Sequence, residues 1–93
     1  MERAGRHIPN RLRKHRRLMG YRQRDVIKLL GHKDANRLSR WEAGLALPST
    51  INLIKLSIIY RTLPSELYFD LLLELREQIK HREQKHFPKE QRT

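Results

Sequence analysis

Apolar residues in the first half of the chain recur three or four positions apart, the spacing that brings side chains to one face of an α-helix. They predict three short helices, over residues 10–19, 22–30 and 34–43. Asn10 and Asp34 are suited to cap the first and the third of these helices. A glycine ends each helix, and these glycines are Gly20, Gly31 and Gly44.

The second half of the chain contains two longer helical segments. The segment from Ser49 to Ile59 is apolar on nearly all sides, which predicts a helix buried at the centre of a small bundle. A further helix begins after Ser65 and runs without interruption to about His86, because Pro88 cannot continue it. No segment has the alternating pattern of a β-strand. The expected fold class is therefore all-α, with five helices in all, of which the C-terminal one is long.

The second and third predicted helices form a pair joined by a glycine turn. In the second, the apolar face is made of Val26, Leu29 and Leu30. In the third, Leu38 and Trp41 lie three residues apart and should face the core, while the outward positions are mostly small, polar or basic. Trp41 could stack on a base instead, but its spacing from Leu38 favours the core. Two short helices arranged in this way have the layout of a DNA-reading helix-turn-helix.

Positive charge is concentrated at the N-terminus of the chain. Its 93 residues have the length of one domain and a net charge of +11. Residues 1–24 contribute +8, from nine Lys or Arg and one Glu. Such a concentration of positive charge favours a polyanionic partner, either nucleic acid or an anionic membrane surface. A simpler alternative is a basic face that only keeps the protein soluble. Residues 1–9 have no apolar periodicity and are expected to form a flexible basic arm, and residues 88–93 a tail.

Other classes of function find little support in the composition. The absence of cysteine excludes disulfides, thiol nucleophiles and cysteine-based zinc sites. No apolar run approaches the roughly 20 residues of a spanning helix, and no secretion signal is evident, so we expect a soluble protein with no membrane partner. No catalytic grouping, cofactor site or metal site is expected. Five histidines, which we expect to face solvent, are His7, His15, His32, His81 and His86.

The sequence resembles the Cro/cI-type helix-turn-helix regulators, also called the Xre family, over about residues 12–69. The resemblance rests on LRKHRRLMG in the first helix, on SRWEAG at the end of the third, and on Gln23, Pro48, Ser49 and the segment 63–67. The segment 39–44 followed by Pro48 is its most specific part. It implies a lambda-repressor-like DNA-binding domain over residues 10–69.

The resemblance implies separate roles for the residues in and around the third helix. Asn36 and Arg40 meet base edges, and they are also the side chains that pair best with adenine and guanine. Ala35 and Ser39 lie beside them and could touch a thymine methyl or a phosphate. Gln23 holds a phosphate at the start of the second helix. Other phosphate contacts are expected from Lys33, Arg37, Arg13, Lys14 and Arg17.

Arg16 lies one turn after Leu12 on the apolar side of the first helix, where a charge is costly unless a carboxylate meets it. Glu42, next to Trp41, could supply that carboxylate. The resemblance implies that Arg16 and Glu42 form an ion pair that ties the first helix to the third. Residues expected to support the reading helix from inside are thus Arg16, Leu38, Trp41 and Glu42.

Two departures from the family pattern concern the turn between the second and third helices. Ile27 stands where the family usually has alanine, and the turn over residues 31–34 is one residue longer than usual. A longer turn gives the reading helix room to move away from a bulkier side chain. We therefore expect the two departures to compensate each other.

The C-terminal helix, within residues 65–87, is longer than the fold requires. One of its apolar lines can pack on the bundle, but Leu72, Leu75 and Ile79 would remain as an exposed apolar patch. We expect these three residues to pair two chains. The alternative is a helix that folds back wholly onto its own domain.

These observations predict a sequence-specific double-stranded DNA-binding transcriptional regulator, a homodimeric repressor that reads the major groove with residues 34–43. We expect a cytoplasmic protein of bacterial or phage origin. One alternative is an antitoxin of a toxin–antitoxin pair that represses its own operon and grips a toxin with its C-terminal helix. Another is an RNA-binding or protein-interaction module, but RNA recognition favours exposed aromatic side chains, and most of those here suit the core.

Overall fold

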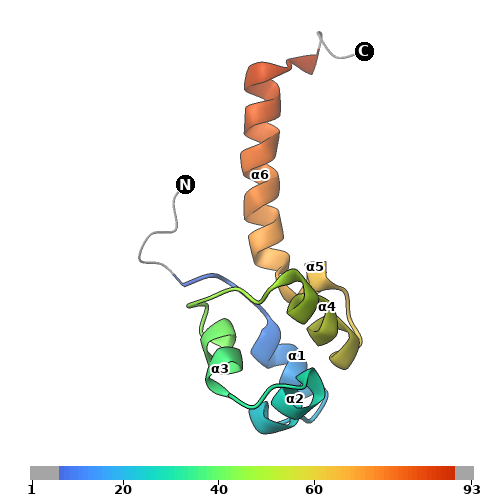
Figure 1. Cartoon of the computed structure of the whole chain (residues 1–93). Helices are drawn as coiled ribbons and strands as arrows, with labels where there is room; N and C mark the ends of the chain where they lie inside the picture. The colour runs from blue at the N-terminus through green and yellow to red at the C-terminus, as the bar shows by residue number, and fades with distance from the viewer. Residues whose placement is uncertain (1–6, 90–93) are drawn as a thin grey trace.

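A computed structural model describes residues 7–89 of the chain, and six helices are found within them. Figure 1 shows the last helix projecting from a body formed by the others. The molecule is accordingly elongated, with principal extents of 52 × 29 × 21 Å. The helices are α1 (Leu12–Leu18), α2 (Gln23–Leu30), α3 (Asn36–Glu42), α4 (Thr50–Ile59), α5 (Pro64–Leu67) and α6 (Phe69–His86).

Side-chain hydrogen bonds lie at the start of the first two helices. Asn10, predicted as the cap of the first helix, precedes the N-cap residue Arg11, and its Oδ1 accepts a hydrogen bond from the Leu12 N–H at 3.1 Å. The Asn10 amide also donates to the Trp41 carbonyl at 3.1 Å, so the same side chain joins α1 to the end of α3. At α2 the cap comes from within the helix, because the Arg22 N–H donates to the Asp25 carboxylate at 2.8 Å.

The core of the body is formed by side chains from every helix except α6. Six of them are completely buried and belong to α1 to α5: Leu12, Val26, Leu30, Leu38, Leu56 and Leu67. Trp41 is 4% exposed and Tyr60 3% exposed, and both join this cluster. The predicted inward positions of Leu38 and Trp41 are therefore confirmed.

The prediction that the fourth helix is buried on all sides is wrong. Only one face of α4 packs on the body, with Asn52, Leu56 and Ser57 buried. On its other face Ile51 is 68% exposed and Ile58 is 70% exposed. α4 lies at the edge of the body and packs on α2 and α5, and no described helix covers its outer side. The chain thus has more apolar side chains than this small body can bury.

The predicted continuous helix over residues 65–86 is divided in two. Tyr68 adopts φ −124° and ψ 38°, which interrupts the helix between α5 and α6. The interruption allows Leu67 and Tyr68, which are adjacent in sequence, to be 0% and 8% exposed in the same core. Beyond it α6 contains no fully buried residue and extends away from the body (Figure 1).

The predicted basic arm over residues 1–9 lies largely outside the described residues, as does most of the predicted tail. Of the arm, residues 7–9 are described, and there the Ile8 N–H donates to the Gly44 carbonyl at 2.8 Å. Ile8 also packs against the core. Within residues 7–89, no helix combines the length and the apolar character needed to cross a bilayer.

Candidate nucleic-acid interface

The turn between α2 and α3 is held by backbone hydrogen bonds around Gly31. Gly31 has φ 80°, a left-handed conformation that ends α2, and the His32 N–H donates to the Ile27 carbonyl at 3.0 Å. Asp34 then accepts a hydrogen bond from the Asn36 N–H at 2.9 Å. The reading helix therefore begins at Asn36, two residues later than the predicted range of 34–43.

Ile27 belongs to the buried core. It is 4% exposed, whereas Leu29, predicted on the inward face, is 54% exposed. The compensation expected between Ile27 and the longer turn stays a prediction.

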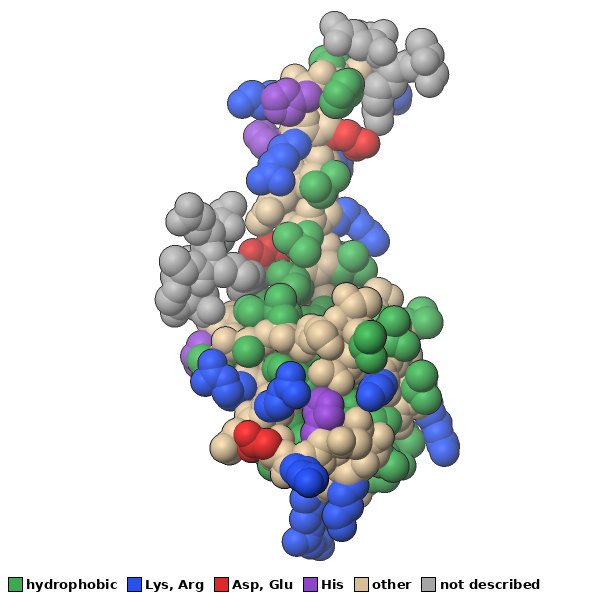
Figure 2. All heavy atoms as spheres, viewed as in Figure 1, with side chains coloured by type: hydrophobic (Ala, Val, Ile, Leu, Met, Phe, Trp, Pro, Cys, Tyr) green, Lys and Arg blue, Asp and Glu red, His purple; other side chains and the backbone are tan. Residues whose placement is uncertain are grey.

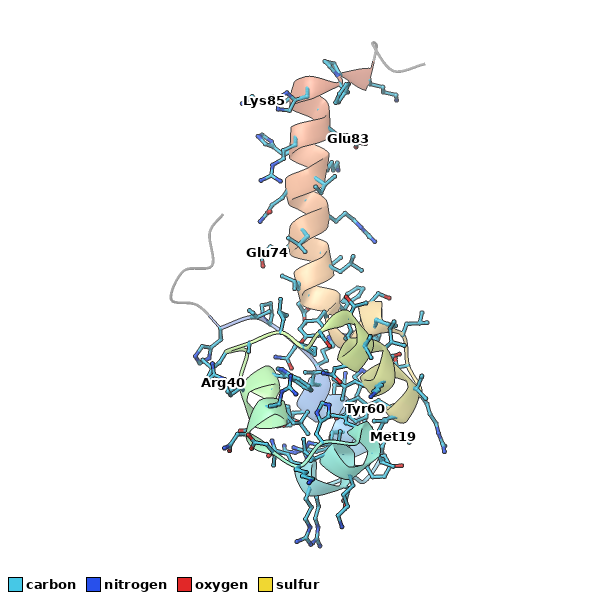
Figure 3. All side chains as sticks on the ribbon, in the orientation of Figure 1. Met19, Arg40, Tyr60, Glu74, Glu83 and Lys85 are labelled. Carbon is cyan, nitrogen blue, oxygen red and sulfur yellow. The ribbon has the colours of Figure 1, made fainter. Side chains whose placement is uncertain are left out.

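α3 has an exposed face and a buried face. Leu38, Trp41 and Glu42 are buried. All four residues predicted to read bases are exposed, and Figure 3 shows Arg40 beside α3 at the outer edge of the body. These residues are Ala35, Asn36, Ser39 and Arg40. Ala35 lies immediately before the first turn of α3 and the other three lie within the helix.

The carboxylate of Glu42 is the centre of a polar cluster beneath α3. The Arg16 guanidinium donates to it twice, from Nε to Oε2 at 2.6 Å and from Nη2 to Oε1 at 3.1 Å. The ion pair predicted between these residues is therefore present. Oε1 also accepts from the Gln23 Nε2 at 3.0 Å and from the Arg13 Nε at 3.4 Å. Residues from α1, α2 and α3 thus share one carboxylate.

These contacts keep the buried carboxylate ionised. Burial by itself would raise the pKa of Glu42, but the hydrogen bonds from Arg16, Gln23 and Arg13 outweigh burial, and the pKa lies below its ordinary value. The same hydrogen bond to Glu42 raises the pKa of Arg16. Arg16 also donates from Nη1 to the Tyr21 carbonyl at 3.0 Å, which satisfies another of its donors.

The structure separates the predicted phosphate contacts into two groups. Gln23 and Arg13 donate to Glu42, although the Arg13 side chain remains 53% exposed. The exposed residues are Lys14, Arg17, Lys33 and Arg37, and the Arg37 guanidinium lies over the Trp41 ring at 5.8 Å from its centroid. Figure 2 shows Lys and Arg side chains gathered at the end of the body farthest from α6.

The contacts of Glu42 with Gln23 and Arg13 are the part of this site that sequence reasoning missed. They join residues 19 and 29 positions apart on three different helices. No local spacing in the sequence identifies such a contact. A buried acid beside a buried arginine was the only available signal, and it identified Arg16 alone.

The prediction that all five histidines face solvent is wrong for two of them. His15 and His32 are half-buried, and the His15 Nε2 lies 3.8 Å from a Glu66 carboxylate oxygen. His15 is covered because α1 packs against the segment that leads into α6. Over residues 7–89, no group of three or more potential ligands could hold a metal ion.

An all-helical body in which a glycine turn joins α2 to an exposed α3 defines a helix-turn-helix protein. The family model for the helix-turn-helix matches residues 12–67, more than half of the chain. The chain therefore belongs to the Cro/cI-type helix-turn-helix proteins, the Xre family of DNA-binding regulators, and its fold is lambda-repressor-like. Searches of curated proteins and of solved structures gave no significant match.

Proposed function

We propose that this regulator is a sequence-specific repressor that reads the major groove of double-stranded DNA with the exposed face of α3. The observation that carries the proposal is the contrast between the two faces of that helix. Leu38, Trp41 and Glu42 hold it from inside, while the side chains of Asn36 and Arg40 remain exposed and make no hydrogen bond or ion pair among the described contacts. A reading helix requires this combination of rigid support and accessible polar side chains.

In this proposal Asn36 and Arg40 meet base edges and the exposed cations meet phosphates. Asn pairs in bidentate fashion with adenine and Arg with guanine. Lys14, Arg17, Lys33 and Arg37 add contacts that carry no sequence information and make the affinity fall as salt rises. Gln23 retains a second amide hydrogen beyond the one donated to Glu42, and it is the proposed phosphate anchor at the start of α2.

Two substitutions distinguish contacts with bases from contacts with phosphates. Arg40→Ala should weaken binding to the preferred duplex by about 1–3 kcal/mol and relax the preference at one base pair. Arg17→Ala should weaken preferred and random duplexes alike, because Arg17 is an exposed cation on α1. Arg17 is a better control than Arg13, which contacts Glu42. Equal losses on preferred and random duplexes for both variants would remove the base-reading role of Arg40.

The proposed repressor is a homodimer in which Leu72, Leu75 and Ile79 of α6 cover one another or a second surface of the partner chain. Leu75 is 46% exposed and Ile79 57% exposed, and left in water they form part of an apolar patch. A dimer should bind a near-palindrome whose half-site centres lie about 34 Å, or a multiple of this, apart. Sedimentation of the intact chain should show a dimer at tens of micromolar, and Leu72→Asp should shift it to monomer.

The antitoxin alternative draws on the same exposed stripe of α6, which could equally cover a different chain. It predicts that the isolated chain is a monomer and that a neighbouring gene encodes the partner. A dimer that resists dissociation on addition of that partner would favour the repressor proposal alone.

A further inference from the structure

Two helices of this molecule expose apolar faces with the same spacing. On α4 the exposed residues are Ile51, Ile54 and Ile58. On α6 the corresponding residues are Leu72, Leu75 and Ile79, and an open groove follows them, lined also by Arg76, Lys80 and Glu83. Glu83, which lines the groove, lies on the side of α6 opposite to Glu74 (Figure 3). In both sets the second residue lies three positions after the first and the third lies seven positions after it.

We propose that the apolar face of α6 docks along the apolar face of α4 in a second copy of the chain, and that the second copy does the same in return. This inference rests on the homodimer proposed above and names the surface that α6 covers. Two-fold symmetry makes the contact reciprocal, because a residue pair formed in one direction is formed again in the other. The dimer thus contains two separate α6–α4 contacts.

The two faces match in length as well as in spacing. Seven residues of an α-helix rise about 10 Å, so each face presents three layers of side chains over the same distance. Side chains spaced three and four apart on two helices interlock as knobs into holes when the helices lie side by side. Leu72 is half-buried within its own chain, contrary to the predicted exposed patch, but the rest of both faces is uncovered, as the exposures of Ile51 (68%), Ile58 (70%) and Ile79 (57%) show.

Pairing of α6 with a second α6 covers the exposed apolar residues less completely than pairing of α6 with α4. Continuing the spacing along α6 leads from Ile79 to Arg82 and His86. Parallel helices would bring each Arg82 against its counterpart. Antiparallel helices centred on Leu75 would use only the three apolar residues of α6 and would leave the exposed isoleucines of α4 uncovered. Against α4 the contact ends after three apolar layers, because that helix ends at Ile59. Arg82 and His86 then remain in solvent.

Pairing of α4 with a second α4 is opposed by charge. Residues 43–65 contain no Asp or Glu and two cations, Lys55 and Arg61. The Lys55 ammonium donates to the Leu30 carbonyl of its own chain at 3.3 Å, whereas Arg61 is exposed. Self-pairing of α4 would supply no carboxylate to offset Arg61. The stripe on α6 is also small when used alone, since a stable interface buries roughly 800 Å² on each partner. The reciprocal contact uses both apolar faces of both chains.

Because the chain has no cysteine, disulfide cross-links can test this arrangement directly. Ile54 and Leu75 are the middle residues of their faces, so they meet whether the helices run parallel or antiparallel. Two chains of different length, one carrying Ile54→Cys and the other Leu75→Cys, would be co-expressed and oxidised. We expect a covalent heterodimer from this pair and little product from either variant alone.

Leu73→Cys provides the matched control. Leu73 is 41% exposed against 46% for Leu75, but two residues along a helix it points to another side. Combined with Ile54→Cys, it should give no cross-link. Efficient cross-linking of Leu75→Cys with itself, or of Ile54→Cys with itself, would overturn the inference while leaving the dimer intact. A dimer without the mixed cross-link would also overturn it, and a monomer in sedimentation would overturn both the inference and the proposed dimer.

Discussion

At the scale of single residues, Glu42 determines how α3 is held. Its carboxylate accepts four hydrogen bonds, two from Arg16 and one each from Gln23 and Arg13. The side chain of Glu42 is 0% exposed and that of Arg16 is 11% exposed. A buried ion pair adds little stability over apolar residues of the same size, but removal of one partner leaves an uncompensated charge.

Glu42→Gln should destabilise the protein by about 3–5 kcal/mol at pH 7, because the Arg16 guanidinium loses its buried carboxylate. Urea unfolding followed by circular dichroism measures this loss. Glu77→Gln, at an exposed position on α6, is the control and should change stability by no more than about 0.5 kcal/mol. An equal effect of the two substitutions would contradict the role assigned to Glu42.

The ionisation of Glu42 should also make the stability of the folded chain depend on pH. The pKa of Glu42 is lower in the folded chain than its ordinary value of 4.5. Its contribution to stability is therefore complete above about pH 4.5 and is lost as the pH falls through the lowered folded value. The difference in stability between the natural chain and Glu42→Gln should accordingly narrow only in acid.

Gly44 is required at the end of α3 by the approach of the N-terminal segment. It has φ +77°, and a Cβ there would lie 2.5 Å from the Ile8 carbonyl oxygen and 2.7 Å from the Ile8 nitrogen. Gly20 has the same φ with no atom within 4 Å of such a Cβ. Gly20→Ala should cost about 1–2 kcal/mol, the cost of a left-handed residue. Gly44→Ala should cost about 1–3 kcal/mol more in thermal unfolding, because the Ile8–Gly44 hydrogen bond must break. Equal costs would refute the steric argument.

At the scale of helices, Arg11 fixes the direction in which α6 leaves the body. Its guanidinium contacts the Asp70 carboxylate at 3.2 and 3.3 Å and Glu66 at 3.1 Å. The guanidinium also lies 4.8 Å from the centroid of the Phe69 ring. The backbone N–H of Arg11 donates to the Leu67 carbonyl at 2.8 Å. The hydrogen bond from Arg11 lowers the pKa of Asp70. These contacts join the start of α1 to both sides of the break at Tyr68.

Arg11→Ala should therefore loosen α6 without loosening the reading helix. Amide hydrogen exchange in the first two turns of α6 should become severalfold faster, while α2 and α3 keep their protection. Arg17→Ala, which removes an exposed cation of α1, should leave both regions unchanged. Unaltered exchange in α6 would mean that packing alone holds the helix at this angle.

The sequence predicts some of these helices better than others, for physical reasons. The spacing of apolar residues and the glycines that end α1, α2 and α3 are local features, so those helices could be predicted within one or two residues. The break at Tyr68 involves neither proline nor glycine and depends on the burial of Leu67 and Tyr68 in a core assembled from distant segments. The exposure of α4 depends on how few elements surround it. Composition cannot reveal either of these features.

In the candidate site, too, the features that depend on local sequence could be predicted and those that depend on distant segments could not. The inward face of α3 and the ion pair of Arg16 with Glu42 could be predicted, because helical spacing and the cost of a buried charge are general. The contacts of Gln23 and Arg13 with the same carboxylate could not, because they depend on the relative placement of three helices. The assignments of bases to Asn36 and Arg40 stay predictions.

At the scale of the whole molecule, the polar and apolar surfaces have separate roles in this account. In the proposed dimer the exposed residues of α3 and the cations of α1 would face DNA, and the apolar faces of α4 and α6 would face the second copy of the chain. Dimerisation then sets the distance between two reading helices, and α6, which projects from the body (Figure 1), contributes to that distance. Specificity thus depends on base contacts within a half-site and on the spacing between half-sites.

Selection of bound sequences from a pool of random DNA duplexes tests whether α3 reads the base sequence. We expect enrichment of an inverted repeat whose half-site centres lie about 34 Å apart or a multiple of this. The same selection with Arg40→Ala should lose the preference at one base pair of each half-site. A pool that remains unenriched after repeated rounds, although the folded protein binds duplex DNA, would contradict sequence-specific reading by α3.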